Sequence, residues 1–423
     1  MGRQLRVLIV VENLPVPFDR RTWSEATTLR AAGHEVTVIC PKGPGYQSGY
    51  EIIDGIRIYR HALPVEARGA AAYFVEYPIA LFWEFVLALK VWRRHGFDVI
   101  HACNPPDLIF LIGLFFKIFT GKSFVFDHHD ANPEFYEAKF GRRGVFWHLL
   151  RLAEKLTFKA ADISIATNES YRRIAIERGD MPPERVFVVR SGPNHARVKR
   201  LPPDPEWSKG RTFLVGYVGV ISRAEGLDLL LASVKHTVYA LGRRDIHFAI
   251  AGSGPELEAI KEMAEDMEVA DYVTFTGRID DEKLLTMLST ADVCVNPDRV
   301  TAMNDISTMN KIMEYMALGK PIVQFDVKEG RFSAQDASLY AKANDTVDFA
   351  EKVLALIDNP ERRAFMGDYG RKRVEEALAW HHEQPKLLNA YAKVAEIRGR
   401  RWKFLNPVRR LFSGSRDAWQ QQL

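Results

Sequence analysis

The sequence predicts an α/β protein built from two Rossmann-like, doubly wound domains that face each other across a cleft. Short apolar runs alternate with helical patterns along the chain, which is typical of βαβ units around a parallel sheet. Residues 193–212 interrupt this rhythm with proline and charge, and the same rhythm then starts again. A chain of 423 residues is long for one core and suits two domains.

The apolar runs give the expected strands in chain order. The first half offers RVLIVV, EVTVIC, VIHAC, SFVFDHH, ISIAT and VFVVRSG, and the second half offers FLVGYVGV, HFAIAGSG, YVTFTGR, VCVNPD, PIVQFD and SLYAK. Helices are expected between them and again at 346–358 and 360–397, the last one interrupted by Pro385. We divide the chain into an N-terminal domain at 1–200, a C-terminal domain at 201–375, a crossover helix at 376–400 that packs back on the N-terminal domain, and a basic amphipathic tail at 401–423.

Composition narrows the class of protein. The chain is 47% hydrophobic and 26% charged, as globular proteins are, and its net charge of +4 is too small to indicate nucleic-acid binding. The three cysteines, Cys40, Cys103 and Cys294, lie far apart in apolar runs, so we expect buried thiols and a cytoplasmic protein. The short apolar run before Glu12 is predicted to be the first strand and not a signal peptide.

Two apolar segments, 77–92 and 107–119, stop short of a membrane span because Glu84 and Lys117 interrupt them. They are either core helices or part of an apolar surface that docks on a bilayer. The tail that begins RGRRWKF mixes cations with aromatic and leucine side chains. It is either solvated or a patch for an anionic membrane, which would place the protein at the inner face of the plasma membrane.

The stretch NDISTMNKIMEYMALGKPIV, residues 304–323, predicts a helix whose first turn binds an anion. With Ser307 or Thr308 as N-cap, the N–H groups of the first turn and the helix dipole would suit a diphosphate. Glu314 lies roughly 10 Å further along the axis, about the reach from a phosphate to the diol of its ribose. The alternative is a capped amphipathic helix with a surface glutamate. The expected contacts in this stretch are Asp305, Ser307, Thr308, Met309, Asn310, Lys311 and Glu314.

Two glycine-rich turns after strands of the second half are further candidates for donor binding. In YVGVISRAEG, Gly219 would let the backbone approach a phosphate and Arg223 would supply a positive charge. In AGSGPELEAI, Gly252 begins a turn that either contacts the nucleotide or is only structural. Such loops follow the carboxyl ends of strands, where ligands of doubly wound sheets collect.

Polar residues also follow two strands of the first half. His128, His129 and Asp130 come directly after VFD, and two adjacent histidines are poorly placed to bind one metal ion. A histidine oriented by a carboxylate is better suited to donate a hydrogen bond to substrate oxygens. The loop after the first strand contributes Asp19, Arg20 and Arg21, which we expect near a sugar or phosphate. No metal or other cofactor is expected.

Three stretches of the second half resemble the sugar-nucleotide domain of the retaining glycosyltransferases of family 4 in order and spacing: AGSGPELE, VTFTGRIDDEKLLTMLSTADVCVNPD and IMEYMALGKPIV. The resemblance covers nearly the whole chain, from VLIVVENLP to the crossover helix with Trp380 and Tyr391. It implies a GT-B fold and a retaining transfer from a nucleotide sugar, expected to be a UDP-sugar, to a sugar or lipid-linked acceptor. It also implies that Glu314 is the ribose-binding acid that closes the Glu-x7-Glu motif and that His129 lies at the sugar site.

The chain departs from this family's pattern at three positions. The first acid of Glu-x7-Glu falls on Ile306, beside Asp305, and the usual phosphate-binding Arg and Lys fall on Val220 and Glu225.

Arg223 and Lys311 are then the cations left to stabilise the departing diphosphate, and with His129 they are the predicted catalytic residues. The expected role is bacterial cell-surface polysaccharide or glycolipid synthesis. Two alternatives are a catalytically weak sugar-nucleotide-binding module, suggested by the missing first glutamate, and a sugar-nucleotide epimerase, for which no pair of acid–base carboxylates is evident.

Overall fold

The computed structural model describes residues 4–62 and 73–417, with side chains for 4–62 and 77–400. It divides into two compact units. One comprises the described residues up to Pro133, Gly144–Val189 and the chain from Gln384 on, and the other comprises Glu134–Arg143 and Arg190–Glu383. Residues 190–200, predicted as the end of the N-terminal domain, therefore belong to the second unit.

The first unit is built on an eight-stranded sheet with the order β3-β4-β2-β1-β5-β6-β7-β8. All neighbouring strands are parallel except the hairpin of β3 and β4. The strands are β1 (Arg6–Val11), β2 (Glu35–Pro41), β3 (Tyr50–Ile53), β4 (Ile56–His61), β5 (Val99–Cys103), β6 (Ser123–His128), β7 (Ile163–Ala166) and β8 (Val186–Val188). The hairpin was not among the predicted strands, although its turn, Asp54 and Gly55, is a common hairpin signal with positive φ at both residues.

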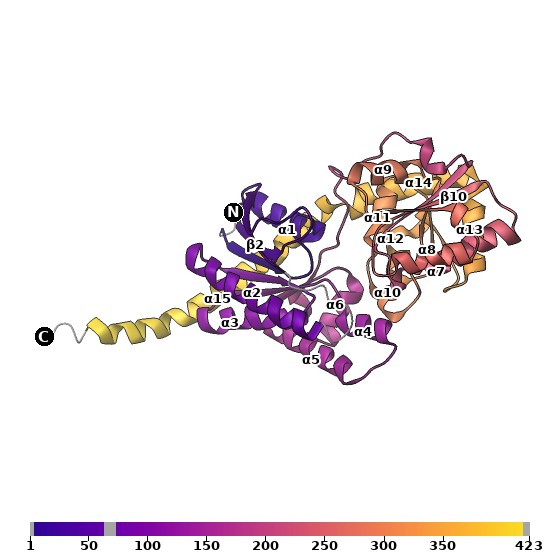
Figure 1. Cartoon of the computed structure of the whole chain (residues 1–423). Coiled ribbons are helices and arrows are strands. Elements are labelled where there is room, and N and C mark those ends of the chain that lie inside the picture. The colour runs from indigo at the N-terminus through magenta and orange to yellow at the C-terminus, as the bar shows by residue number, and fades with distance from the viewer. Residues whose placement is uncertain (1–3, 63–72, 418–423) are drawn as a thin grey trace. The chain divides into compact units, whose positions relative to one another are not determined.

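Helices cover both faces of this sheet (Figure 1). They are α1 (Arg20–Ala31), α2 (Tyr73–Arg94), α3 (Phe110–Thr120), α5 (Val145–Ala160), α6 (Glu169–Glu177) and α15 (Trp380–Asp417), with α4 (Asn132–Phe140) in the connection to α5. Side chains alternate along β6, so Phe126 packs on Phe158 of α5, whereas Asp127 faces α1. Alternation along β6 thus places apolar packing on the α5 side of the sheet and charged side chains on the α1 side.

The second unit contains a parallel six-stranded sheet with the order β11-β10-β9-β12-β13-β14. Its strands are β9 (Phe213–Val218), β10 (Ile246–Ala251), β11 (Val273–Gly277), β12 (Val293–Asn296), β13 (Ile322–Phe325) and β14 (Ser338–Ala341). Its helices are α7 (Leu227–Lys235), α8 (Leu257–Asp266), α9 (Asp281–Thr290), α10 (Ala302–Ile306), α11 (Asn310–Ala317), α12 (Lys328–Ala334), α13 (Thr346–Ile357) and α14 (Pro360–Arg373). Each predicted strand is present, and the prediction of two Rossmann-like parallel-sheet units is confirmed.

The predicted helix at 360–397 is in fact two helices. A π-helical turn follows α14 at Val374–Leu378, and Ala379 is extended with ψ of 154° before α15 begins at Trp380. Pro385 lies near the start of α15 and does not end it, since a proline is best tolerated in the first turns of a helix. Among the described residues, no helix combines the length and apolar character needed to cross a membrane.

His128, predicted to contact substrate, is instead a core residue at the end of β6. Its ring lies among those of Phe126, Phe158 and Tyr171, with centroids 5.5, 5.3 and 4.6 Å away. Burial and, to a smaller extent, the nearby charge of Arg178 lower the pKa of His128 to about 3. Alternation along β6 turns this ring toward α5, away from the polar face that carries Asp127.

This low pKa makes stability depend on pH. An unfolded histidine has a pKa of about 6.5, so the unfolded chain binds a proton that native His128 rejects at pH values between the two. The stabilisation is complete above pH ~6.5 and is lost as the pH falls toward about 3. Between pH ~6 and ~4, we expect the unfolding free energy of the wild type to fall about 1.4 kcal/mol per pH unit more steeply than that of His128→Gln. Urea unfolding across this range tests the difference, and equal slopes would contradict it.

Candidate donor and sugar sites

The candidate donor site lies at the carboxyl edge of the second sheet, where β9 and β12 are neighbours. The chain leaves β9 through α7 toward β10 on one side, and leaves β12 through α11 toward β13 on the other. Loops that leave in opposite directions open a crevice at the strand ends, which is the usual ligand position in doubly wound sheets.

Tyr315 of α11 joins the two strand ends. Its buried hydroxyl accepts a hydrogen bond from the Val218 N–H at 2.9 Å and donates one to the Val295 carbonyl at 3.3 Å. A buried hydroxyl that satisfies backbone groups of both strands fixes where the following loops begin. The sequence does not mark this residue as functional, because a tyrosine in the apolar stripe of a helix looks like an ordinary core residue.

The structure brings two predicted donor residues, Gly219 and Lys311, together. Lys311 Nζ lies 2.7 Å from Asp298 Oδ1 and 4.9 Å from the centroid of the Tyr217 ring. A Cβ on Gly219 would come within 3.3 Å of the same nitrogen, and within 2.5 Å of the Tyr217 hydroxyl. Burial raises the pKa of Asp298, although the ammonium of Lys311 opposes this. A cation therefore lies directly against the loop after β9, where the backbone has no side chain to keep an anion away.

Gly252 supports this loop from the next strand. Its φ is +148°, and a Cβ would lie 1.8 Å from the Gly219 carbonyl oxygen. The Gly219 N–H also bonds the Ala251 carbonyl at 3.1 Å. A glycine is thus required at 252 by the approach of two backbones, which is a structural role in addition to any ligand contact.

The first turn of α11 differs from the prediction. The N-cap is Met309, which makes no side-chain cap, and α11 begins at Asn310. Ser307 caps the end of α10 instead, with its hydroxyl bonded to the Met303 carbonyl at 2.7 Å, and Thr308 lies in the loop between the helices. The prediction that Ser307 or Thr308 caps this helix is therefore wrong. Met309 gives the first turn of α11 no side-chain cap, and of the N–H groups in this turn that of Ile312 already bonds the Met309 carbonyl at 3.1 Å, which leaves those before it for an anion.

Two other predicted donor residues have different surroundings. Asp305 Oδ1 accepts a hydrogen bond from the Lys328 N–H at 2.8 Å, so it caps the start of α12. Arg223, in the short 3-10 turn Arg223–Glu225, is exposed and has no hydrogen bond or ion pair with any residue the structure describes. Arg223 is thus available to an incoming anion, while the carboxylate of Asp305 already serves the fold.

Glu314 is paired with a residue outside the predicted site, Arg197. A guanidinium nitrogen of Arg197 bonds Glu314 Oε1 directly, and a second nitrogen lies 3.5 Å from Asp281. Both partners of the Arg197–Glu314 pair are partly exposed, at 24% and 17% of their side chains. A ribose diol that approaches Glu314 must displace Arg197 or share the carboxylate with it. Residues 193–212 gave no periodic signal that could have located Arg197.

The polar face of the first sheet holds a buried ion pair between Arg21 and Asp127. Arg21 bonds both oxygens of Asp127, at 2.8 and 3.1 Å, and its third nitrogen donates to the Val189 carbonyl at 2.8 Å. Burial opposes the charge of Asp127, but Arg21 and His129 outweigh it, so the pKa of Asp127 lies well below its ordinary value. Arg21 was predicted near a sugar or phosphate, and the structure shows it as a buried partner of Asp127.

His129 begins the loop that follows this pair. Its Nε2 bonds Asp127 Oδ2 at 2.5 Å, and its backbone N–H bonds Asn104 Oδ1 at 2.7 Å. Asn104 also accepts from the Asp130 N–H and donates to the Asp130 carbonyl, so it fixes the loop backbone. The His129 ring is 13% exposed, and its Nδ1 has no partner in the described part of the chain. The carboxylate thus orients the ring and leaves one nitrogen for a substrate.

The other residues predicted for the sugar side are Asp19, Arg20 and Asp130. Asp19 is the N-cap of α1 and accepts from the Thr22 N–H and hydroxyl, both at 3.0 Å. Arg20 and Asp130 are exposed. The cap explains why an aspartate precedes two arginines here, since it satisfies an N–H group at the start of the helix.

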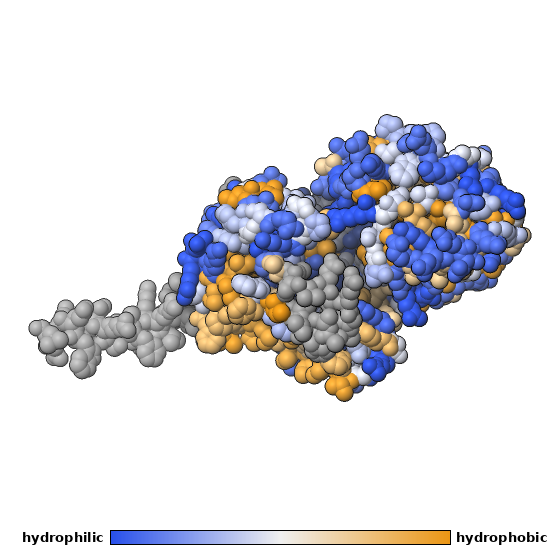
Figure 2. Space-filling model, in the orientation of Figure 1, coloured by the Kyte–Doolittle hydropathy of each residue, from blue (hydrophilic) through white to orange (hydrophobic). Residues whose placement is uncertain are grey.

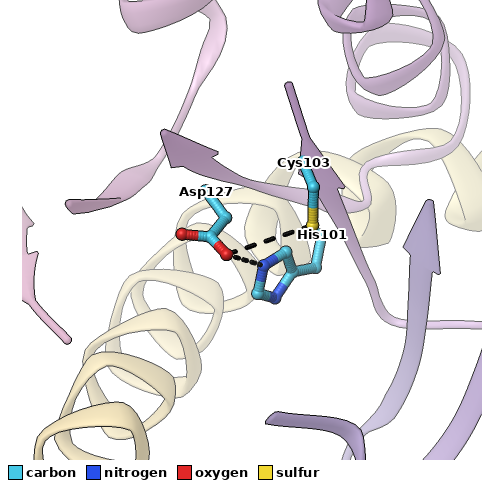
Figure 3. A group of neighbouring side chains, drawn as sticks. All are labelled: His101, Cys103 and Asp127. Carbon is cyan, nitrogen blue, oxygen red and sulfur yellow. Dashed lines mark hydrogen bonds and ion pairs between the residues drawn. The ribbon is translucent and has the colours of Figure 1, made fainter. Parts of the chain in front are cut away.

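His101, Cys103 and Asp127 form the closest group of possible metal ligands among the described residues (Figure 3). Their geometry fits an arginine better than a metal. Asp127 is already bonded by Arg21 and His129, and His101 Nδ1 bonds the Tyr391 hydroxyl at 2.8 Å. Burial raises the pKa of Cys103 well above its ordinary value, so the thiolate that a metal needs is disfavoured.

Residues 19–197 match the family model described as "Glycosyltransferase Family 4", and residues 212–359 match "Glycosyl transferases group 1". Together the two matches cover most of both units. The phosphatidyl-myo-inositol mannosyltransferase of Mycolicibacterium smegmatis is 24% identical over 375 residues, which are 88% of each chain.

A GDP-mannose-dependent monoacylated alpha-(1-6)-phosphatidylinositol monomannoside mannosyltransferase of Corynebacterium glutamicum is 27% identical over 168 residues. That match spans 39% of this chain and 43% of the relative's length. Among solved structures, the sucrose-phosphate synthase of Thermosynechococcus elongatus superposes with a TM-score of 0.76 at 19% identity, over 93% of this chain and 99% of that one. The fold is therefore GT-B.

Removal of Asp127 should destabilise the first unit strongly, because Arg21 would lose both hydrogen bonds to this carboxylate and keep only Glu25, 3.1 Å away, whose charged form burial disfavours. We expect Asp127→Ala to lower the unfolding free energy by about 3–5 kcal/mol. The matched control is Asp326→Ala, which breaks an exposed pair with Arg331 and should lower it by no more than about 1 kcal/mol. Urea unfolding compares them, and equal losses would contradict a special role for the buried pair.

Proposed function

This chain belongs to glycosyltransferase family 4, and from that premise we propose that it transfers a sugar from a nucleoside diphosphate donor to an acceptor hydroxyl. The product keeps the donor's anomeric configuration in this proposal. The observation that carries it is the position of Lys311, with its ammonium against Gly219 at the crevice between β9 and β12.

Lys311 supplies the charge that two neighbouring positions lack. The loop after β9 carries Val220 and Glu225 where the family resemblance places a cation. In the structure Glu225 is held by the Ser222 hydroxyl, and the ammonium of Lys311 acts on it from α11. We propose that Lys311, exposed Arg223 and the uncapped N-terminus of α11 bind the diphosphate and stabilise its growing charge as the sugar leaves.

We propose that Glu314 binds the ribose of the donor. A carboxylate accepts two hydrogen bonds from a diol, and this one lies two turns into α11. Donor binding exchanges the pair with Arg197 for the ribose hydroxyls. The released Arg197 is still within 3.5 Å of Asp281, so its charge keeps a partner.

In the first unit, we propose that His129 meets the sugar. Its bond to Asp127 fixes the orientation of the imidazole, whose Nδ1 has no partner among the described residues. A ring held in this way stabilises the oxocarbenium-like sugar while the acceptor attacks from the face that the diphosphate leaves. Asp127 acts as a positioning residue, since it touches His129 and not the substrate.

The acceptor in this proposal is a lipid-linked sugar or a glycolipid of the bacterial cell surface. The support comes from two relatives, whose names describe mannosyltransferases that act on phosphatidylinositol-based acceptors. One of them depends on GDP-mannose, so GDP-sugars have to be compared with the UDP-sugars that the sequence predicts.

A second candidate is a nucleotide-sugar-binding module with weak or no transferase activity. The observation that favours it is the loss of the first motif acid: Ile306 takes its place, and Asp305 is bound to the start of α12. An epimerase has no such support, since the two carboxylates beside Lys311 are already engaged: Asp298 pairs with its ammonium, and Glu225 accepts from the Ser222 hydroxyl.

Nucleotide release measured with and without acceptor separates these functions. With UDP- and GDP-sugars and a short-chain glycolipid, we expect release with one donor to rise at least about tenfold when acceptor is present. Tight nucleotide binding without release would favour the binding module. Release independent of acceptor would contradict transfer.

Lys311→Met should lower kcat by about 100-fold, because it removes a cation that acts on the leaving diphosphate. The matched control is Lys283→Met on α9, whose ammonium is 68% exposed and pairs only loosely with Asp280 at 3.7 Å. A control near wild-type activity with a strongly impaired Lys311→Met supports the site. Equal activity of both variants would remove Lys311 from it.

A further inference from the structure

Three helices of the first unit present an unusually apolar outer face. In α5, Val145, Phe146, Leu149, Leu152 and Leu156 are all exposed, the first by 74%, and their spacing puts most of them along one side of the helix. Its other side is buried through Thr157 and Phe158. A surface helix of a globular protein has one apolar stripe, and α5 has a second one that faces outward.

The neighbouring helix α3 continues this face. Ile118 and Phe119 are exposed by 65% and 72%, and Leu111 by 51%. Helices α3 and α5 are in contact, and Phe115 and Phe116 of α3 pack against Phe85 of α2. The three helices thus form one layer, which we call the α2–α3–α5 face.

The same layer is visible on the surface of the molecule. Figure 2 shows the region of α3 and α5 mostly in orange, whereas the visible face of the second unit is mainly blue. Phe82 and Trp83 of α2 are exposed by 60% and 45%, so this helix adds to the apolar area. A contiguous patch of this kind marks an interaction surface.

Charge on the α2–α3–α5 face has a single sign. Within residues 77–94 of α2 and the whole of α3 and α5, the acids are Glu84 and Glu154, and both are fully buried. The exposed ionised side chains in these ranges are all basic: Lys90, Arg93, Arg94, Lys155 and Lys159. Lys155 also pairs with Asp180 at 2.9 Å. An apolar face bordered by cations complements a surface of acyl chains and anionic headgroups.

We propose that the α2–α3–α5 face docks the protein on an anionic lipid bilayer. The apolar side chains of α3 and α5 enter the boundary between headgroups and acyl chains, and the bordering cations contact the phosphates. A second copy of the chain fits this face less well, because a symmetric pair would bring cations against cations. The inference concerns lipid binding alone and does not depend on the proposed transfer reaction.

The sequence had pointed to residues 77–119 and to the basic tail for such contact. The structure adds α5, which was not predicted to take part. The side chains of the tail beyond residue 400 lie outside the described residues, so the proposal rests on the helices alone. A variant of α5 therefore distinguishes lipid binding through the helices from lipid binding through the tail.

Flotation of the full chain with vesicles of phosphatidylcholine and phosphatidylglycerol tests the proposal. We expect the wild type to float at low salt, and the double variant Leu149→Asp, Leu152→Asp to partition about tenfold or more weakly. The matched control is Val347→Asp, Phe365→Asp, which changes two exposed apolar side chains on α13 and α14 of the second unit and should float as the wild type does.

Folding of each variant is checked by circular dichroism and melting temperature. Unchanged flotation of a folded α5 variant would overturn the proposal and assign binding to the tail. A wild type that fails to float would also overturn it. A wild-type dimer that becomes monomeric in the α5 variant, without flotation of either, would assign the face to self-association instead.

Discussion

The buried hydroxyl of Tyr315 is the interaction on which the candidate donor site depends. It bonds the ends of β9 and β12 at once, so the two loops that leave these strands start from a fixed separation. Because both bonds use backbone groups that would otherwise be buried without partners, their loss carries a desolvation penalty. The ammonium of Lys311 comes from the same helix, one turn earlier, and so reaches Gly219 from a rigid support.

The two units use buried charge in different ways. In the first, Arg21 and Asp127 form a fully buried pair, while burial and the charge of Asp127 raise the pKa of Glu25 well above its ordinary value. The charge of Arg21 therefore balances that of Asp127 alone, and Asp127 orients His129 directly after the end of β6. In the second, Glu314 and its partner Arg197 are only partly buried, whereas Lys311 pairs with the buried Asp298. A buried pair sets geometry, whereas a half-exposed pair can be replaced during binding.

Local sequence patterns predicted the helices, strands and turns better than the pairs that side chains form. Parallel strands buried on both faces appear as apolar runs, and glycine marks the turns after them, so the fold and the loops of Gly219 and Gly252 were predictable. The pairing of Glu314 with Arg197 joins residues 117 positions apart, and no periodicity reports it. The cap of α11 was misplaced because Ser307 closes the helix before it, although serine is typical of an N-cap. His128 and His129 look alike in sequence, but strand alternation buries one and leaves the other at the rim.

In the proposed function, the second unit binds a nucleoside diphosphate with its ribose on Glu314. Calorimetric binding of the nucleoside diphosphate and of its 2′,3′-dideoxy analogue, to wild type and to Glu314→Ala, tests it most directly. The account predicts that the wild type prefers the natural nucleotide by about tenfold, since two hydrogen bonds to a charged group are lost with the analogue. It predicts that Glu314→Ala binds both with equal, weaker affinity. A variant that kept the wild-type preference would contradict it.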